Sequence, residues 1–305
     1  MSGSPCACIP GGYVPNPDGA GCVEEQYFIS EPPQGQTQLP DVEPGTPRDV
    51  TVRVTSYQTG QPKEGAVVRF HLDVDLTSGG HDHGETYGRR PRGTMIGNNC
   101  VPEPSGAPDT YDCTTGTEGY AGFTFGAPDV SGKHNITATC VSHACSGSKT
   151  FNINVKVDGL WPIPSSEYYS LIEDGSSKII GSTTDHTSNH YLANIASMKL
   201  WRLAADFYDY QVRHGVAKPT LLHLNDASLK WGGVFDLDGD WDEPHAEHRL
   251  GTVIDVRANG SAGAISSSDF TIFRALAAKY KIDARIHSPG EINQHFHLRL
   301  LGRSE

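Results

Sequence analysis

The stretch YLANIASMKLWRLAADFYDYQVRHG, residues 191–215, is where the hydrophobic pattern of the chain changes from strand-like to helical. Its apolar positions recur every three or four residues, the period of one face of an α-helix. They are Leu192, Ala196, Leu200, Leu203, Phe207 and Tyr210. Gly215 follows the last of them and predicts the C-terminal end of the helix. This stretch therefore predicts a long amphipathic helix in the second half of the chain.

Downstream of this helix the sequence combines a second helical pattern with short strands. The segment SSSDFTIFRALAAKYK predicts a helix over about 269–281, because serines suited to capping precede apolar residues at helical spacing. The segments GTVIDVRA, residues 251–258, and QHFHLRLL, residues 294–301, are typical of short strands. We therefore expect residues 159–305 to form a mixed α+β domain with a central antiparallel sheet.

Upstream of residue 159 the pattern is that of an all-β domain. Short β-branched and aromatic runs are separated by Gly, Pro, Asn and Ser, as in VTVRVTSY, AVVRFHLDV, GYAGFTFGA, HNITATCV and KTFNINVKV. They predict an antiparallel sandwich over residues 46–158. Residues 1–45 are rich in Pro, Gly and Cys and have no hydrophobic period, so an irregular lead-in is expected there. The chain is thus predicted to be multidomain.

Composition restricts the classes of partner. The chain has 305 residues, of which 36% are hydrophobic and 20% charged, as expected for a soluble protein of about two domains. Its formal net charge of −12 disfavours nucleic acid and anionic membrane surfaces as partners. No apolar run reaches the roughly 18–20 residues of a membrane helix. Small, peptidic or glycan-like partners are favoured, and the oligomeric state stays open.

All seven cysteines lie in the first half of the chain, away from the histidine-rich C-terminal region. Two pairs, Cys100 with Cys113 and Cys140 with Cys145, flank polar turns, as disulfides of exported β domains often do. The odd count leaves one thiol free or paired outside the chain, and the full connectivity stays open. We expect a secreted, periplasmic or cell-surface protein whose signal peptide has been removed, since Met1-Ser-Gly-Ser-Pro lacks the regions of one.

Two motifs in the α+β region carry residues suited to metal binding. In HRLGTVID, His248 and Asp255 are seven positions apart, and a turn at Gly251 would let His248 lean over the strand that carries Asp255. In QHFHLRL, His295 and His297 alternate along a strand and therefore project from one face, opposite the apolar residues between and after them.

Together these motifs supply the ligand set of a catalytic zinc ion. His248, Asp255 and His297 are two imidazoles and one carboxylate, which is the set that hydrolytic zinc sites use when a fourth position is left for water. Zinc in such a site activates water and polarises a scissile carbonyl. The motifs therefore predict one zinc ion per chain, with calcium as a weaker alternative at DLDGDWD, residues 236–242.

HRLGTVID with HFH resembles the H-x6-D and HxH signatures of the zinc metallopeptidases that include lysostaphin-type enzymes, D-Ala-D-Ala peptidases and penicillin-insensitive murein endopeptidases. The resemblance implies zinc on His248, Asp255 and His297, with His295 near the bound water. It also implies hydrolysis of a peptide bond in or near peptidoglycan. Residues 46–158 resemble bacterial immunoglobulin-like domains in EGAVVRF, TGTEGYAGFTF and SGKHNITATC.

Several nearby residues are candidates for supporting roles. His245 is a candidate proton shuttle or a plain loop histidine, and Glu291 is a candidate general base whose spacing departs from that of the D-Ala-D-Ala peptidase type. Arg249 is a candidate for binding a substrate carboxylate or for a surface ion pair. Trp241 is a candidate cleft wall, with ordinary packing as the alternative.

Two alternatives to a peptidase stay open. One is a surface adhesin or binding protein with a non-catalytic zinc site, as in the hedgehog signalling domains that resemble the same family. The other is binding of carbohydrate or protein by loops of the β domain. HDHGE, residues 81–85, together with His71 is a candidate second metal site, although a solvated loop is the favoured interpretation there.

Overall fold

The computed structural model describes residues 13–15, 22–32, 37–81, 89–97, 99–172, 188–236, 241, 246–259 and 263–301. The chain forms two compact units. Unit 1 consists of Met1–Asp75, Arg92–Pro128 and Lys133–Asn154, and unit 2 of Leu76–Pro91, Asp129–Gly132 and Val155–Glu305. Within the described ranges, none of the helices has the length and apolar content needed to cross a membrane. The predicted β-rich, multi-sheet architecture is confirmed.

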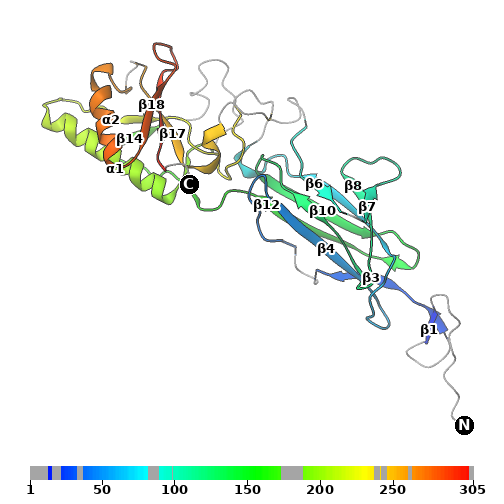
Figure 1. Ribbon diagram of the computed structural model, residues 1–305. Coiled ribbons are helices and arrows are strands. Elements are labelled where there is room, and N and C mark those ends of the chain that lie inside the picture. The colour runs from blue at the N-terminus through cyan, green and yellow to red at the C-terminus, as the bar shows by residue number, and fades with distance from the viewer. Residues whose placement is uncertain are drawn as a thin grey trace, which may run out of the picture. The chain divides into compact units, whose positions relative to one another are not determined.

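Unit 1 is built from two five-stranded sheets, in the orders β12-β10-β5-β8-β7 and β11-β3-β4-β9-β6, with a separate β1-β2 pair (Figure 1). The strands are β1 Tyr13–Pro15, β2 Cys22–Glu24, β3 Tyr27–Glu31, β4 Pro47–Ser56, β5 Val67–Val74, β6 Thr94–Ile96, β7 Cys100–Pro102, β8 Thr110–Thr114, β9 Tyr120–Gly126, β10 Gly132–Cys140, β11 Cys145–Ser146 and β12 Ser148–Val155. The cysteines among the described residues, namely Cys22, Cys100, Cys113, Cys140 and Cys145, belong to this unit.

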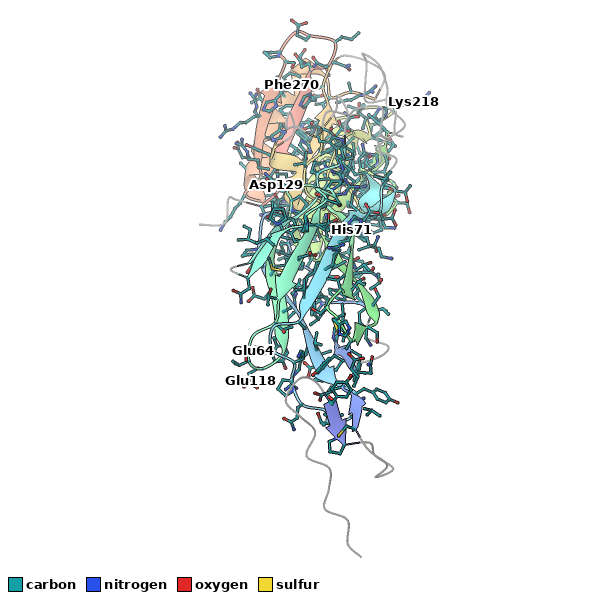
Figure 2. The ribbon with its side chains drawn as sticks, turned by 90° about the vertical axis from the view of Figure 1, so that its right-hand side faces the viewer. Glu64, His71, Glu118, Asp129, Lys218 and Phe270 are labelled. Atoms are coloured by element: carbon teal, nitrogen blue, oxygen red, sulfur yellow. A yellow bond between two sulfur atoms is a disulfide. The ribbon has the colours of Figure 1, made fainter. Side chains whose placement is uncertain are left out.

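Alternating side chains give unit 1 its core. Every second residue of β10 is buried, as its alternating sequence predicts. Phe70 on β5 and Phe123 on β9 meet edge to face at 5.1 Å, so the two sheets pack through their apolar faces. Figure 2 marks His71 on β5 and Glu118 in the turn before β9.

Both expected disulfides are present in unit 1. Cys100 and Cys113 are directly opposite each other in the β7–β8 pair and are bonded. Cys140 and Cys145 close the turn between β10 and β11. The prediction made from their flanking turns is confirmed for these two pairs.

Unit 2 contains a five-stranded sheet in the order β14-β16-β17-β19-β18 together with two helices. Strands β16, β17, β19 and β18 pair antiparallel, whereas the edge strand β14 is parallel to β16. The elements are β13 Leu160–Pro162, β14 Tyr169–Leu171, β15 Tyr191–Ala193, α1 Asn194–Arg213, β16 Leu222–Leu224, β17 Val253–Arg257, α2 Phe270–Lys279, β18 Asp283–His287 and β19 His295–Arg299, with 3-10 turns at Ser78–Gly80, Ala246–Leu250 and Ser267–Asp269.

The helices cover one face of this sheet and leave the other face to polar residues. Phe296 on β19 packs against Phe273 of α2 at 4.8 Å between ring centroids, and Phe273 in turn contacts Phe207 of α1 at 5.3 Å. Ile254 and Val256 of β17 belong to the same buried cluster. Because side chains alternate along a strand, the residues between these apolar positions project from the opposite face.

Three segments within the range expected to form the sandwich belong to unit 2 instead, namely Leu76–Pro91, Asp129–Gly132 and residues 155–158. Arg90 holds the first two together. Its buried guanidinium donates to the carbonyl oxygens of Leu76, Ser78, His81 and Ser131. A buried guanidinium needs such a set of acceptors, which sequence patterning alone does not predict.

Candidate metal centre

The first motif folds as a turn followed by a strand. His248 lies in the 3-10 turn Ala246–Leu250, and Asp255 is the middle residue of β17. Gly251 between them has a φ of +64°, which glycine adopts without strain, and it forms a bend between this turn and β17. As a result, His248 Nε2 lies 3.5 Å from Asp255 Oδ2.

Strand register brings the second motif to the same place. Asp255 on β17 is directly opposite His297 on β19 in the antiparallel ladder, so both side chains share a face. His297 Nδ1 is 2.9 Å from Asp255 Oδ1. One donor atom from each of His248, Asp255 and His297 lies within 4.8 Å of the others. The three residues are 1%, 1% and 5% exposed, respectively.

The protonation of His248 suits a metal ligand. Its Nδ1 is 2.8 Å from the carbonyl oxygen of Ala227, and because a carbonyl only accepts, Nδ1 carries the hydrogen. Burial lowers the pKa of His248 and so favours the neutral ring. Its Nε2 then presents a lone pair toward the carboxylate of Asp255. Two electron-pair donors that face one another in a buried site fit a cation between them.

The charge state of the other two residues is set by their contact. Burial raises the pKa of Asp255, but the hydrogen bond from His297 and the positive charge of that ring outweigh it and hold the pKa well below its usual value. Burial lowers the pKa of His297, but hydrogen bonds to Asp255 and Glu247 outweigh that effect and raise it. Asp255 is therefore an anion at neutral pH, as a metal ligand must be.

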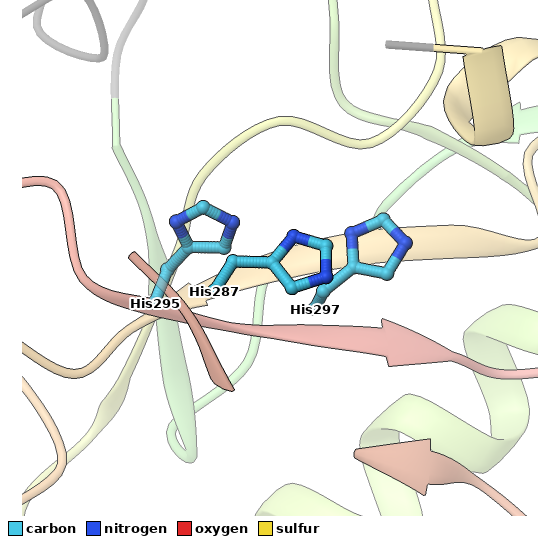
Figure 3. Close-up of side chains that lie close together, drawn as sticks. All are labelled: His287, His295 and His297. Atoms are coloured by element: carbon cyan, nitrogen blue, oxygen red, sulfur yellow. The ribbon is translucent and has the colours of Figure 1, made fainter. Parts of the chain in front are cut away.

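Two further histidines line the same face (Figure 3). His295 Nε2 lies 3.4 Å from Asp255 Oδ2, and its Nδ1 donates to the carbonyl oxygen of Asn293 at 2.7 Å. His287 on β18 is directly opposite His295 in register and stacks on His297 at 4.5 Å, with an interplanar angle of 11°. His287, His295 and His297 also form a group whose donor atoms lie within 4.8 Å.

Sequence reasoning missed His287 and Glu247. The signal for His287 was present, because Ser288-Pro289-Gly290 after it is a turn sequence that makes 283–299 a hairpin. An alternating strand before that turn places His287 on the face of His295. Glu247 gave no comparable signal, since its partner His297 is 50 residues away.

The residues that the sequence suggested for supporting roles differ in their contacts and exposure. Arg249 forms an ion pair with Asp129 at 2.5 Å, which is the surface-type pairing considered as its alternative. The backbone N–H of Trp241 donates to Asp236 Oδ2, and its ring packs against that of His81 at 4.7 Å. Glu291 is exposed in the β18–β19 turn. His245 lies outside the described residues.

The two other proposed ion sites are described only in part. His81 is fully buried and its Nε2 is 2.7 Å from Asp236 Oδ1, so it does not belong to a solvated loop. His71 pairs with Thr110 Oγ1 at 2.9 Å. In the described part of the chain, neither histidine belongs to a group able to hold a metal. Residues 82–88 and, of the DLDGDWD segment, residues 237–240 and 242 lie outside the described residues.

No protein-family model matches the sequence, and no curated protein matches it. Three solved structures illustrate the structural likenesses. A titin structure has a TM-score of 0.22 at 10% identity and covers 46% of this chain, which spans 56% of that one. Domains 5-6 of the S-layer protein SbsC have a TM-score of 0.24 at 10% identity, and the match covers 89% of this chain and 83% of that one. A DUF4466 family protein from Parabacteroides merdae has a TM-score of 0.21 at 7% identity, and the match covers 90% of this chain and 96% of that one. At these TM-scores the likenesses support no conclusion.

Proposed function

We propose that this protein is a zinc-dependent peptidase that hydrolyses a peptide bond, with peptidoglycan as the substrate class. The observation that carries the proposal is the convergence of His248, Asp255 and His297, whose donor atoms lie within 4.8 Å in a buried site. Two imidazoles and a carboxylate are the donor set of hydrolytic zinc. Zinc bound there would polarise the scissile carbonyl and activate water.

The histidines that are not ligands supply the proton chemistry. His295 is part-exposed, with 19% of its side chain accessible, and its Nε2 faces the carboxylate of the metal site. His287 is exposed beside it on the neighbouring strand. An imidazole in this position accepts a proton from water and returns it to the leaving amine. We assign this role to His295, which has His287 opposite it on β18.

The substrate class rests on the resemblance carried by HRLGTVID and HFH. Murein peptidases are among the enzymes that share these signatures, and the disulfides of unit 1 are compatible with an exported protein that meets the cell wall. The finer fold assignments belong to the same proposal. Unit 1 is an immunoglobulin-like sandwich that acts as a spacer or adhesion module, and unit 2 is the α+β zinc peptidase domain with a central antiparallel sheet.

The test is the metal content of the purified chain together with its turnover of peptidoglycan. Wild type, His248→Ala, His297→Ala and the control His143→Ala, whose side chain is 90% exposed in unit 1, are compared by elemental analysis and by release of soluble muropeptides. We expect one zinc ion per chain in wild type and the control, and loss of zinc and turnover in the two ligand variants. Zinc without turnover supports a non-catalytic site in a surface adhesin or binding protein, and absence of zinc refutes the metal centre.

A further inference from the structure

We propose that Glu247 is the positioning residue of the metal centre: it orients the ligand His297 and thereby sets the affinity of the site for zinc. The inference rests on the proposed metal site and adds to it a residue outside the ligand set. Glu247 Oε2 lies 2.9 Å from His297 Nε2, while the other ring nitrogen, Nδ1, lies 2.9 Å from Asp255 Oδ1. The imidazole is thus held between two carboxylates.

Both ring nitrogens of His297 face a carboxylate, Nε2 that of Glu247 and Nδ1 that of Asp255. An ionised carboxylate only accepts, so Glu247 would keep the ring hydrogen on Nε2 when a metal ion takes the place of the hydrogen on Nδ1. Nδ1, on the side of Asp255 and His248, would then be the ligand atom. A carboxylate behind a histidine ligand fixes its tautomer and ring orientation and raises its basicity.

Glu247 is itself held in place from the other side. Arg299 donates from Nε to one carboxylate oxygen of Glu247 and from Nη2 to the other, a bidentate pair. Arg299 Nη1 also contacts Asp283 Oδ2 at 3.2 Å. Asp283 and Arg299 are opposite each other in the β18–β19 ladder. The sheet therefore anchors the arginine, and the arginine anchors Glu247.

Glu247 and Arg299 are both close in sequence to a proposed ligand. Glu247 immediately precedes the ligand His248 in the same 3-10 turn. Arg299 follows the ligand His297 by two positions on β19 and so projects from the same face. One turn thus supplies a ligand and orients a second ligand, and movement of the turn alters both.

The same contacts argue against Glu247 as the general base. Both of its oxygens accept hydrogen bonds from Arg299, and one of them also contacts His297. A general base must lie within hydrogen-bond reach of the proton that it removes, whereas these contacts direct the carboxylate toward side chains of the protein itself. Glu247 acts through His297 rather than on the substrate.

The experiment compares the full-length chain with Glu247→Gln, Glu247→Ala and the control Glu118→Gln, which removes the same charge from an exposed glutamate of unit 1 (Figure 2). The dissociation constant for zinc is measured by competition with a chromogenic chelator. The visible absorption spectrum of the cobalt-substituted protein reports the geometry of the ligands. Thermal unfolding of the metal-free proteins shows whether each variant folds.

We expect Glu247→Gln, which retains an acceptor but loses the charge, to weaken zinc binding by about 10-fold, and Glu247→Ala by up to about 100-fold with an altered cobalt spectrum. Glu118→Gln should match wild type. If the Glu247 variants lower only the unfolding temperature and leave zinc affinity and the cobalt spectrum unchanged, the carboxylate is a structural ion-pair partner and the inference is wrong.

Failure of this inference is distinguishable from failure of the proposed function. If wild type binds no zinc, the metal centre itself is refuted, together with any role of Glu247 in it. If wild type binds zinc tightly and the Glu247 variants bind it equally well, only the positioning role is lost. If wild type binds zinc, the variants bind it more weakly and no protein cleaves peptidoglycan, the positioning role stands while the peptidase proposal falls.

Discussion

His248 and His295 have closely similar local environments. Nδ1 of each ring donates to a backbone carbonyl, of Ala227 and Asn293 respectively, and Nε2 of each faces Asp255 Oδ2, at 3.5 and 3.4 Å. They differ in exposure, because the His248 side chain is 1% accessible and that of His295 is 19% accessible. Burial suits a permanent ligand, whereas access to solvent suits a group that exchanges protons with substrate and water.

At the residue scale we therefore expect His295→Ala to separate metal binding from catalysis. The variant should retain its zinc, because His248, Asp255 and His297 remain, and should lose turnover by about 10²- to 10⁴-fold, the usual contribution of a positioned proton carrier. Zinc content and muropeptide release from the same preparation measure the two effects. Loss of zinc in His295→Ala would instead make His295 a ligand, and His143→Ala serves as the unaffected control.

At the scale of elements, the turn at Gly251 links the β13–β15 pair to the proposed metal centre. A Cβ on Gly251 would lie 2.3 Å from Leu160 Cδ2 and 3.1 Å from the backbone nitrogen of Ala193, and the φ of +64° disfavours other residues. Ala193 also donates its N–H to the carbonyl of Gly251. The position of His248 therefore depends on close packing between this turn and the β13–β15 pair.

Gly251→Ala should destabilise the protein by about 2 kcal/mol or more, since left-handed strain adds to a steric clash. It should also weaken zinc binding, because the turn carries His248. Thermal unfolding and zinc competition measure both effects. Gly215→Ala is the matched control, with a φ of +75° but no atom within 4 Å of the added Cβ, and equal losses in the two variants would show that packing at Gly251 is unimportant.

The two helices are joined by a titratable contact. Asp206 of α1 accepts hydrogen bonds from Lys279 Nζ at 2.6 Å and Tyr280 Oη at 2.7 Å, at the end of α2. Burial raises the pKa of Asp206, but these hydrogen bonds outweigh it and the pKa lies below the usual 3.8. Since the folded-state pKa is depressed, the contact stabilises the fold above pH 3.8 and loses its effect as the pH falls through the folded-state pKa.

Asp206→Asn should accordingly lower the unfolding temperature by a small amount at pH 7, on the order of 2 °C, because the contact is partly exposed. The difference between variant and wild type should shrink as the pH falls below 3.8. Unfolding curves recorded from pH 7 to pH 3 measure this trend. A difference that is independent of pH would mean that the aspartate contributes through packing rather than through charge.

At the scale of the whole molecule, the disulfides and the proposed metal ligands belong to different units. The two disulfides described above lie in unit 1, and His248, Asp255 and His297 lie in unit 2. The Cys100–Cys113 disulfide closes a loop with a sequence separation of 13, and Cys140–Cys145 one of 5. In the chain-entropy model such loops stabilise the folded state by about 3 and about 2 kcal/mol.

We therefore expect calorimetry to show two transitions that respond to different reagents. A reductant should lower the transition of unit 1 and leave zinc content unchanged, whereas a zinc chelator should lower the transition of unit 2 and leave the disulfides unchanged. A single transition that shifts with either reagent would show that the two units unfold as one cooperative body.

The sequence by itself determined the local features. Side-chain periodicity identified α1, α2 and the longer strands β4, β5, β9, β10 and β12 together with β17 and β19. Spacing placed His295 and His297 on one face of a strand and a turn between His248 and Asp255. These features follow from backbone geometry over a few residues, where the periods of 2 and 3.6 decide which side chains share a face. The cysteine pairs were equally local, being 13 and 5 positions apart.

Only the tertiary structure decided which distant groups meet. The register of β17 and β19 sets Asp255 beside His297, which is 42 residues away, and the packing of the 3-10 turn sets Glu247 beside the same ring from 50 residues away. His287 joins through the β18–β19 pairing, and His81 pairs with Asp236 across 155 positions. Such contacts depend on how whole elements pack, and packing free energy is a sum over many residues that no short stretch of sequence contains.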